Sequence, residues 1–125
     1  MKKCIRLLVC GDRNWEDKSM IMVCVLDLLT SGKKIDVIIE GEARGADSLA
    51  RDVAKELGIP IEAHPAQWAK YGKQAGILRN IKMLEVGLPD LVMAFHDNIE
   101  ESKGTKHMMT IAKKAGVKVN HFHHN

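Results

Sequence analysis

The 125-residue sequence has few aromatic residues, no long hydrophobic run and no large excess of charge of either sign. Its longest apolar run, from Met20 to Leu26, is far shorter than the ~18–20 residues that a membrane-spanning helix requires. No basic and apolar leader opens the chain, so we expect no membrane association and no export signal. The net charge is only +3, with both signs mixed along the chain, which disfavours a nucleic-acid partner.

Cysteines and histidines are also too few and too poorly spaced to predict a metal site or a disulfide framework. The three cysteines, Cys4, Cys10 and Cys24, lack metal or redox spacing, which is typical of small buried side chains in a reducing cytoplasm. We therefore expect a cytoplasmic protein. Three histidines lie near the end of the sequence: His121, His123 and His124. They have no companion carboxylate or cysteine, so we predict a solvent-exposed tail, with no metal and no cofactor.

Short apolar runs alternate with stretches of helical periodicity along the whole chain. Strands are expected at 5–10, 35–39, 59–63, 90–95 and 117–119, and helices at 17–30, 46–57, 73–85 and 104–115. This alternation predicts parallel strands joined by right-handed crossovers, and hence an α/β three-layer sandwich. We expect one domain over residues 1–125 with a mainly parallel sheet of about five strands. In such folds ligands bind beyond the carboxyl ends of the strands.

The first strand is followed by Gly11, Asp12 and Arg13. The glycine permits a tight turn and a close approach of the backbone, and the arginine is suited to a phosphate or a carboxylate. The alternative is that Gly11 only makes a turn.

The second strand leads directly into a helix through Gly41, Glu42, Ala43, Arg44, Gly45, Ala46 and Asp47. Two glycines at such a junction allow backbone amides to face a ligand at the positive end of the helix dipole, and Arg44 adds a cation. Asp47 lies in the first helical turn. It either complements the dipole and caps the helix, or it binds ribose hydroxyls or acts as a base.

The fourth strand is followed by His96, a candidate ligand contact, and then by Gly104 and Thr105, which open the next helix. Backbone amides and a hydroxyl at a helix start form a second candidate anion site. The alternative is an ordinary helix start capped by Ser102 or Thr105.

Three arginines near one rim, Arg13, Arg44 and Arg79, favour a phosphorylated ligand over a neutral one. Trp68 and Tyr71 are candidates for stacking on a base, although a tryptophan in a loop also serves as a core plug. The helix at 17–30 is apolar almost all round, which is typical of a deeply buried helix or of a subunit interface.

Several short motifs occur in a fixed order along the chain. They are Gly11-Asp12-Arg13, the block 41–47, Pro65-Ala66-Gln67-Trp68, Tyr71-Gly72-Lys73, Ala75-Gly76, Arg79-Asn80, Pro89-Asp90 and Gly104-Thr105. From Ile5 to about Val119 the chain resembles the YspA-type, cpYpsA-related members of the SLOG superfamily. This superfamily relates the DNA-processing Smf/DprA proteins to the LOG phosphoribohydrolases.

The resemblance implies a Rossmann-like fold that binds nucleotides or nucleotide-derived ligands, commonly as a homodimer, in a group with many members from phages and mobile elements. It also implies that one set of residues lines the ligand cleft: Gly11, Arg13, Gly41, Arg44, Gly45, Asp47, Arg79, Gly104 and Thr105. Position along the chain adds further candidates: Asp12, Glu42, Ala43, Trp68, Tyr71, Asn80 and His96.

The chain departs from the LOG enzymes where their chemistry resides. Those enzymes, which cleave the N-glycosidic bond of nucleoside monophosphates, carry P-G-G-x-G-T-x-x-E. Only Gly104-Thr105 is present here, and Met108 stands in the place of the catalytic glutamate. A methionine neither activates water nor stabilises an oxocarbenium ion, so that mechanism does not transfer intact. A glycosidase would need Asp47, Glu40 or Glu42 instead. The alternative for Glu40, which we prefer, is a purely structural pair with an arginine.

The leading hypothesis is a sensor or sequestering protein that binds a nucleoside monophosphate, an ADP-ribose-like compound or a cyclic nucleotide, and that forms a homo-oligomer. The first alternative is a nucleotide phosphoribohydrolase that uses Asp47 or Glu40. The second alternative, single-stranded nucleic-acid binding of the DprA type, is disfavoured by the modest charge and the scarce aromatic residues.

Overall fold

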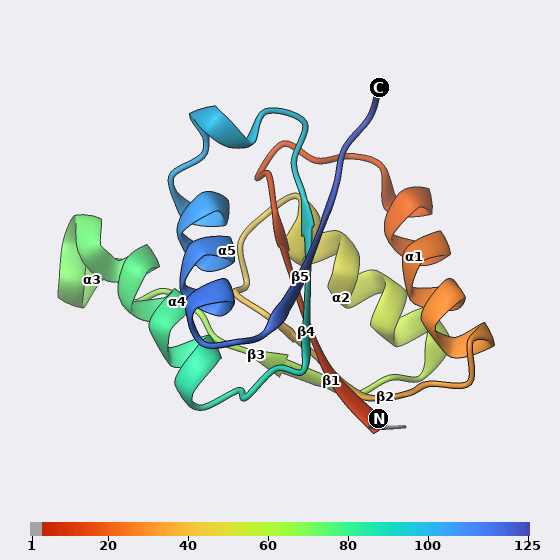
Figure 1. Cartoon of the computed structure of the whole chain (residues 1–125). Coiled ribbons are helices and arrows are strands. Elements are labelled where there is room, and N and C mark those ends of the chain that lie inside the picture. Colours follow the sequence, from red (N-terminus) through yellow and green to blue (C-terminus); the bar gives the residue numbers. More distant parts are fainter. Residues whose placement is uncertain (1–3) are drawn as a thin grey trace.

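Five parallel strands form the middle layer of the protein (Figure 1). They are β1 (Cys4–Gly11), β2 (Lys34–Glu40), β3 (Ile61–Ala63), β4 (Leu91–Phe95) and β5 (Lys118–Phe122). The computed structural model describes residues 4–125 and places the strands in the order β3-β2-β1-β4-β5. The chain proceeds from β1 toward one edge of the sheet and then returns to the other side of β1. The strand order therefore reverses between β1 and β4, which is where such folds bind ligands.

Two pairs of helices cover the two faces of this sheet (Figure 1). One face carries α1 (Lys18–Thr30) and α2 (Ala46–Leu57), and the other carries α4 (Ala75–Glu85) and α5 (Gly104–Lys114). Alternate residues of the strands point to opposite layers, as strand geometry requires: Leu7 and Val9 pack beneath the first pair, whereas Leu8 and Cys10 pack beneath the second. The predicted α/β three-layer sandwich, Rossmann-like with a mainly parallel sheet of about five strands, is confirmed, and all strand pairs are parallel.

Two short helical segments were not predicted from the sequence, α3 (Trp68–Tyr71) and the 3₁₀ turn η2 (Ile99–Glu101). The helix predicted at 73–85 begins instead with a 3₁₀ turn, η1 (Gly72–Gln74), followed by α4. Single turns are too short to show an apolar period, so the sequence carries no signal for them. The α1 helix is not fully buried, because Val23 and Leu26 are exposed on its outer side. Across residues 4–125, no helix has the length and apolar character needed to cross a membrane.

The predicted solvent-exposed histidine tail is confirmed in part: His123 and His124 are exposed, but His121 is half-buried in a strand and His124 is held by other parts of the chain. Strand β5 extends to Phe122 and thus includes His121, because its backbone pairs with the free edge of β4. Beyond the strand, the imidazole of His124 stacks on the buried indole of Trp15. An open strand edge and an aromatic face elsewhere in the chain therefore order this segment, and neither is visible in the local sequence.

Candidate functional site

A cavity of about 470 Å³ lies at the carboxyl ends of β1 and β4, where the strand order reverses. This volume is in the usual range for small-molecule sites. Four segments meet around it: the loop after β1, the loop after β2, the α3–α4 region, and the turn that opens α5. They bring together most of the residues predicted from the sequence, namely Gly11, Asp12, Arg13, Ala43, Asp47, Trp68, Arg79, Asn80, His96, Gly104 and Thr105.

The remaining predicted residues lie around or outside this cavity. Gly41, Glu42 and Arg44 line a second hollow of about 480 Å³, which shares Arg13, Ala43, Trp68 and Arg79 with the first. Tyr71 lines a third hollow of about 280 Å³, which also touches Arg79. Gly45 lines none of these three hollows.

Positive charge prevails on the wall of the main cavity. Its cationic side chains are Arg13, Lys73, Arg79 and Lys103, and its carboxylates are Asp12 and Asp47. Lys73 and Lys103 were not among the predicted site residues, although Lys73 belongs to one of the motifs and Lys103 follows three acidic residues whose charge it offsets. Cationic side chains converging on a concave and partly apolar wall favour an anionic ligand.

Arg79 forms the partition between the cavity and its neighbours. Its Nη1 donates a hydrogen bond to the carbonyl oxygen of Gly41 at 2.7 Å, and its Nε donates to Oδ1 of Asn80 at 3.0 Å. These bonds engage two of the five N–H groups of the guanidinium. They fix its plane at the wall that all three hollows share.

Asn80 is buried and connects this arginine to the start of α5. Its amide nitrogen lies 3.1 Å from the carbonyl oxygen of Gly104 and 3.1 Å from Nδ1 of His107. Because the Asn80 amide donates, Nδ1 of His107 accepts, and the ring proton of a neutral His107 resides on Nε2. Burial lowers the pKa of His107, which favours this neutral form. His107 lines the cavity but matched no motif in the sequence.

Asp47 occupies the floor of the cavity with only 6% of its surface exposed. Its Oδ2 accepts hydrogen bonds from the backbone nitrogens of Gly41 at 3.1 Å and Ala43 at 3.2 Å. Burial raises the pKa of Asp47 to about 6, although the hydrogen bond from Ala43 and the charge of Arg79 oppose the increase. These two amides were expected to face a ligand. Instead they bind a carboxylate of the protein itself, so the anion cradle expected at this loop is already filled.

Glu40 has a structural partner, as preferred from the sequence. Its side chain is 0% exposed, and Oε1 accepts from Arg51 Nη2 at 3.0 Å and from the Glu42 nitrogen at 2.8 Å. Its Oε2 is buried without a hydrogen-bond partner among the described residues. Glu40 lines none of the three hollows, which separates it from Asp47.

Two predicted glycines serve close packing between the loops. A side chain at Gly11 would collide with the carbonyl group of Phe95 on β4. Gly45 has a positive φ of 76°, and a side chain there would collide with the backbone of Asp12 and Arg13. The loops after β1 and β2 are thus pressed together, and the Ala46 nitrogen donates to the Asp12 carbonyl oxygen at 3.1 Å.

The start of α5 is capped by Ser102, the alternative considered from the sequence. Its Oγ accepts a hydrogen bond from the Thr105 nitrogen at 3.0 Å. Ser102, Lys103, Gly104 and Thr105 all line the cavity, so the helix start faces the site, but the amides of Thr105 and Lys106 both donate to the Ser102 Oγ. Met108, in the place of the LOG glutamate, is fully buried in the core and does not line the cavity.

Trp68 is 49% exposed and is therefore not a core plug. The guanidinium of Arg13 lies 5.5 Å from the centre of its ring, a cation–π distance. The exposed indole face and this cation stand together at the mouth of the cavity, on the boundary with the second hollow. Such a pair is suited to a planar group attached to an anion.

Neither thiol nor metal chemistry is favoured by the described residues of the cavity. Cys10 lines the cavity, but burial raises the pKa of its thiol far above the ordinary value and keeps it protonated. Within residues 4–125, no cluster of three or more His, Cys, Asp and Glu side chains is arranged to hold a metal ion.

Comparison with known proteins gives two matches. Residues 5–71 match the family model of the YspA, cpYpsA-related SLOG family. The Gene 61 protein of Mycobacterium phage D29 is 37% identical over 122 residues, which cover 94% of this chain and 95% of the phage protein.

Proposed function

The chain belongs to the YspA, cpYpsA-related SLOG family, and from this premise and the cavity we propose that it binds a nucleotide or a nucleotide-derived molecule. The observation that carries the proposal is the wall of the cavity. Four cationic side chains converge there, and an exposed indole stands at its mouth. A nucleotide combines the two groups that this wall accommodates, an anion and a planar ring.

The phosphate would lie near Arg79 and Lys103 rather than against the amides of the loop after β2. Gly41 and Ala43 donate to Asp47, so those amides offer little to an anion. Arg79 is held at the partition, and Lys103 lies at the start of α5, where the helix dipole adds to its charge. The base would stack on Trp68, and Asp47 on the floor would accept a hydrogen bond from a ribose hydroxyl.

One observation favours a second function, the cleavage of an N-glycosidic bond. A buried carboxyl with its pKa raised to about 6 is matched to proton transfer near neutral pH, and Asp47 lines the cavity. Binding without turnover remains our first proposal, because the position of the LOG glutamate is occupied by a buried methionine.

The experiment incubates the purified protein with nucleoside monophosphates, ADP-ribose and cyclic nucleotides, removes unbound compound by desalting, and chromatographs what denaturation releases. Intact compound supports binding, whereas free base and sugar phosphate support the glycosidase. If no compound of the panel is retained or cleaved, the proposal is wrong.

Matched variants locate the site. Lys103→Ala is compared with Lys106→Ala, because both lysines belong to the start of α5 but only Lys103 lines the cavity. Trp68→Ala is compared with Tyr71→Ala, because both rings lie on α3 but Tyr71 lines a different hollow. A charge-assisted contact contributes about 1.5–3 kcal/mol, so we expect Lys103→Ala to weaken affinity about tenfold or more. If the two variants of each pair lose the same affinity for the nucleotide, the nucleotide does not bind in this cavity.

A further inference from the structure

His124 is held between two carboxylates and an indole ring. Its Nε2 lies 2.8 Å from Oδ2 of Asp17, and its Nδ1 lies 2.9 Å from Oδ2 of Asp97. Its ring stacks on Trp15 with the ring centres 4.7 Å apart and the planes 16° from parallel. The backbone nitrogen of His124 also donates to Asp97 Oδ1 at 2.6 Å.

This geometry specifies the protonated imidazole. A neutral ring has one N–H and donates to one carboxylate only, whereas the imidazolium donates from both nitrogens. With both ring nitrogens facing ionised oxygens, loss of the proton would set a lone pair of the ring against a carboxylate. The stacked indole face adds a favourable contact for a cation.

The groups around His124 come from three separate parts of the chain. Asp17 caps α1 in the loop after β1, and its Oδ1 accepts from the Met20 nitrogen at 3.0 Å. Asp97 belongs to the loop after β4, and His124 itself follows β5. Figure 1 shows both loops and the tail at the same end of the sheet. His124 therefore connects the loop after β1 to the loop after β4. This connection adds to the hydrogen bond between the Asp12 nitrogen and the Phe95 carbonyl oxygen, where the two strands end.

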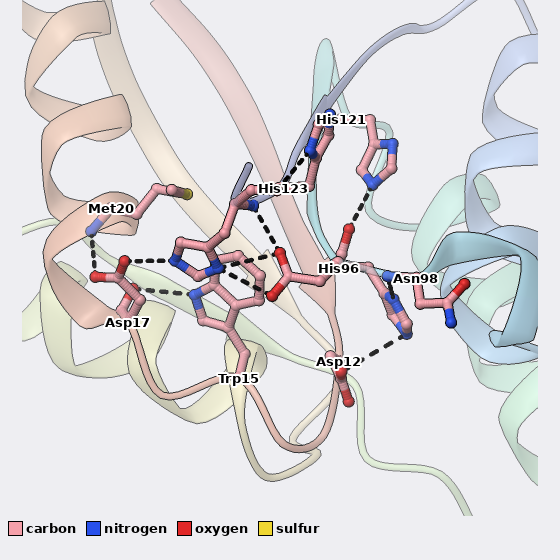
Figure 2. Close-up of polar contacts among 10 residues, drawn as sticks. Asp12, Trp15, Asp17, Met20, His96, Asn98, His121 and His123 are labelled. Carbon is pink, nitrogen blue, oxygen red and sulfur yellow. Dashed lines mark hydrogen bonds and ion pairs between the residues drawn. The ribbon is translucent and has the colours of Figure 1, made fainter.

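The same two loops supply one side of the cavity. The Trp15 nitrogen donates to the carbonyl oxygen of Asp12 at 3.1 Å. Oδ2 of Asp12 lies 3.9 Å from His96 Nε2, a contact that Figure 2 marks with a dashed line. His96 in turn accepts at its carbonyl oxygen from the ring of His121, 2.8 Å away. Asp12 and His96 both line the cavity.

We propose that protonated His124 acts as a clasp that ties the loop after β1 to the loop after β4 and holds Asp12 and His96 in place at the cavity wall. That this clasp regulates access of a nucleotide rests on the proposed function. The clasp itself does not, since all of its contacts lie within the protein.

The pH range of the clasp follows from the charged groups that face it. These are Asp17 from the cap of α1, Asp97 from the loop after β4, and the neighbouring His123 of the tail, while Trp15 is uncharged. Hydrogen bonds with Asp17 and then Asp97 raise the pKa of His124 above its ordinary 6.5. Bonds with His124 lower the pKa of both aspartates below their ordinary 3.8. Between pH 3.8 and pH 6.5, His124 is therefore protonated and both aspartates are ionised, so that all contacts of the clasp are present. The clasp is lost as the pH rises through the raised pKa of His124.

The first test is an NMR titration of the histidine ring protons. We expect the midpoint of His124 above 6.5, and we expect it to fall toward 6.5 in the double variant Asp17→Asn, Asp97→Asn. Asparagine retains the capping ability of Asp17, so this variant preserves α1. A midpoint at or below 6.5 in the wild type would overturn the proposal.

The second test is hydrogen–deuterium exchange at a pH below the His124 midpoint. We expect His124→Gln to make exchange several-fold faster in residues 12–17 and 96–103, and His123→Gln to leave both segments unchanged. The ring of His123 bonds to the carbonyl oxygen of His124 rather than to a carboxylate, which makes it the matched control. Unchanged exchange in His124→Gln would refute the clasp. Neither test uses a nucleotide, so failure of the clasp and failure of the proposed function are distinguishable.

Discussion

Asp47 is an acid held out of water on the floor of the cavity, and replacing it by asparagine tests the electrostatics of the site. Its pKa rises from an ordinary 3.8 to about 6 in the folded protein. The folded state therefore binds this proton more tightly than the unfolded state does, and the contribution of Asp47 to stability falls as the pH rises from 3.8 through 6. The full difference corresponds to about 3 kcal/mol, of which about 2 kcal/mol develops between about pH 4.5 and about pH 7.5.

The assay is urea unfolding of the wild type and of Asp47→Asn at these two pH values. Asparagine retains an oxygen that can accept from Gly41 and Ala43, so the loop after β2 keeps its anchor. We expect the stability of the variant relative to the wild type to increase by about 2 kcal/mol from the lower to the higher pH. Asp52→Asn, an exposed acid on the same helix, is the control and should show no such change. If both variants respond to pH alike, the buried acid has been wrongly assigned.

Three further predictions concern packing and assembly. Gly45→Ala should lower the free energy of unfolding by more than about 2 kcal/mol, because Gly45 has a positive φ and touches the neighbouring loop. Gly104→Ala should be tolerated, because a side chain there meets open space. Similar melting temperatures for the two variants would contradict this prediction. Arg51→Met should cost about 3 kcal/mol in urea unfolding, because it leaves the buried charge of Glu40 without its ion pair, and a loss near zero would contradict that role. We expect the protein to self-associate through the apolar outer side of α1. Val23→Asp should then reduce the mass measured by light scattering to the 13.9 kDa of one chain. A wild-type protein of that mass would exclude self-association.

The fold was predictable because each core element carries its own signal. The mostly apolar run Ile35–Ile39 is followed within two residues by Gly41, and the apolar stripe of the helix from Ala46 to Leu57 ends at Gly58 and Pro60. These signals are local, and parallel pairing follows from their alternation. The path of the tail was not predictable, because the indole and the carboxylates that hold His124 come from residues about a hundred positions earlier or some thirty positions earlier.

The candidate site was predictable in outline but not in detail. The rule that ligands bind at strand ends located Asp12, Asp47 and Gly104 on one cavity. The rule says nothing about hydrogen bonds inside the loops, so it did not show that Asp47 takes the amides of its own loop. Lys103 was not predicted as a site residue for a different reason. It lines the cavity beside Gly104, whose carbonyl oxygen accepts a hydrogen bond from Asn80 of another helix, and that tertiary contact is not visible in the local sequence.

The central position of β1 has a consequence for how the chain assembles during synthesis. One edge of β1 pairs with β2, which follows soon after it, but its other edge waits for β4, and the contact between Arg6 and Asp90 spans 84 residues. Until β4 arrives, β1 presents an open strand edge, and the layer that contains α1 and α2 lacks the side chains of Leu91, Met93 and Phe95. The early product is thus a half-sheet prone to pairing with other chains, and it cannot form the cavity, because α4 and α5 supply the opposite wall. The middle of the sheet is therefore completed when β4 docks against β1, and the cavity is completed after that, when α5 packs on the sheet.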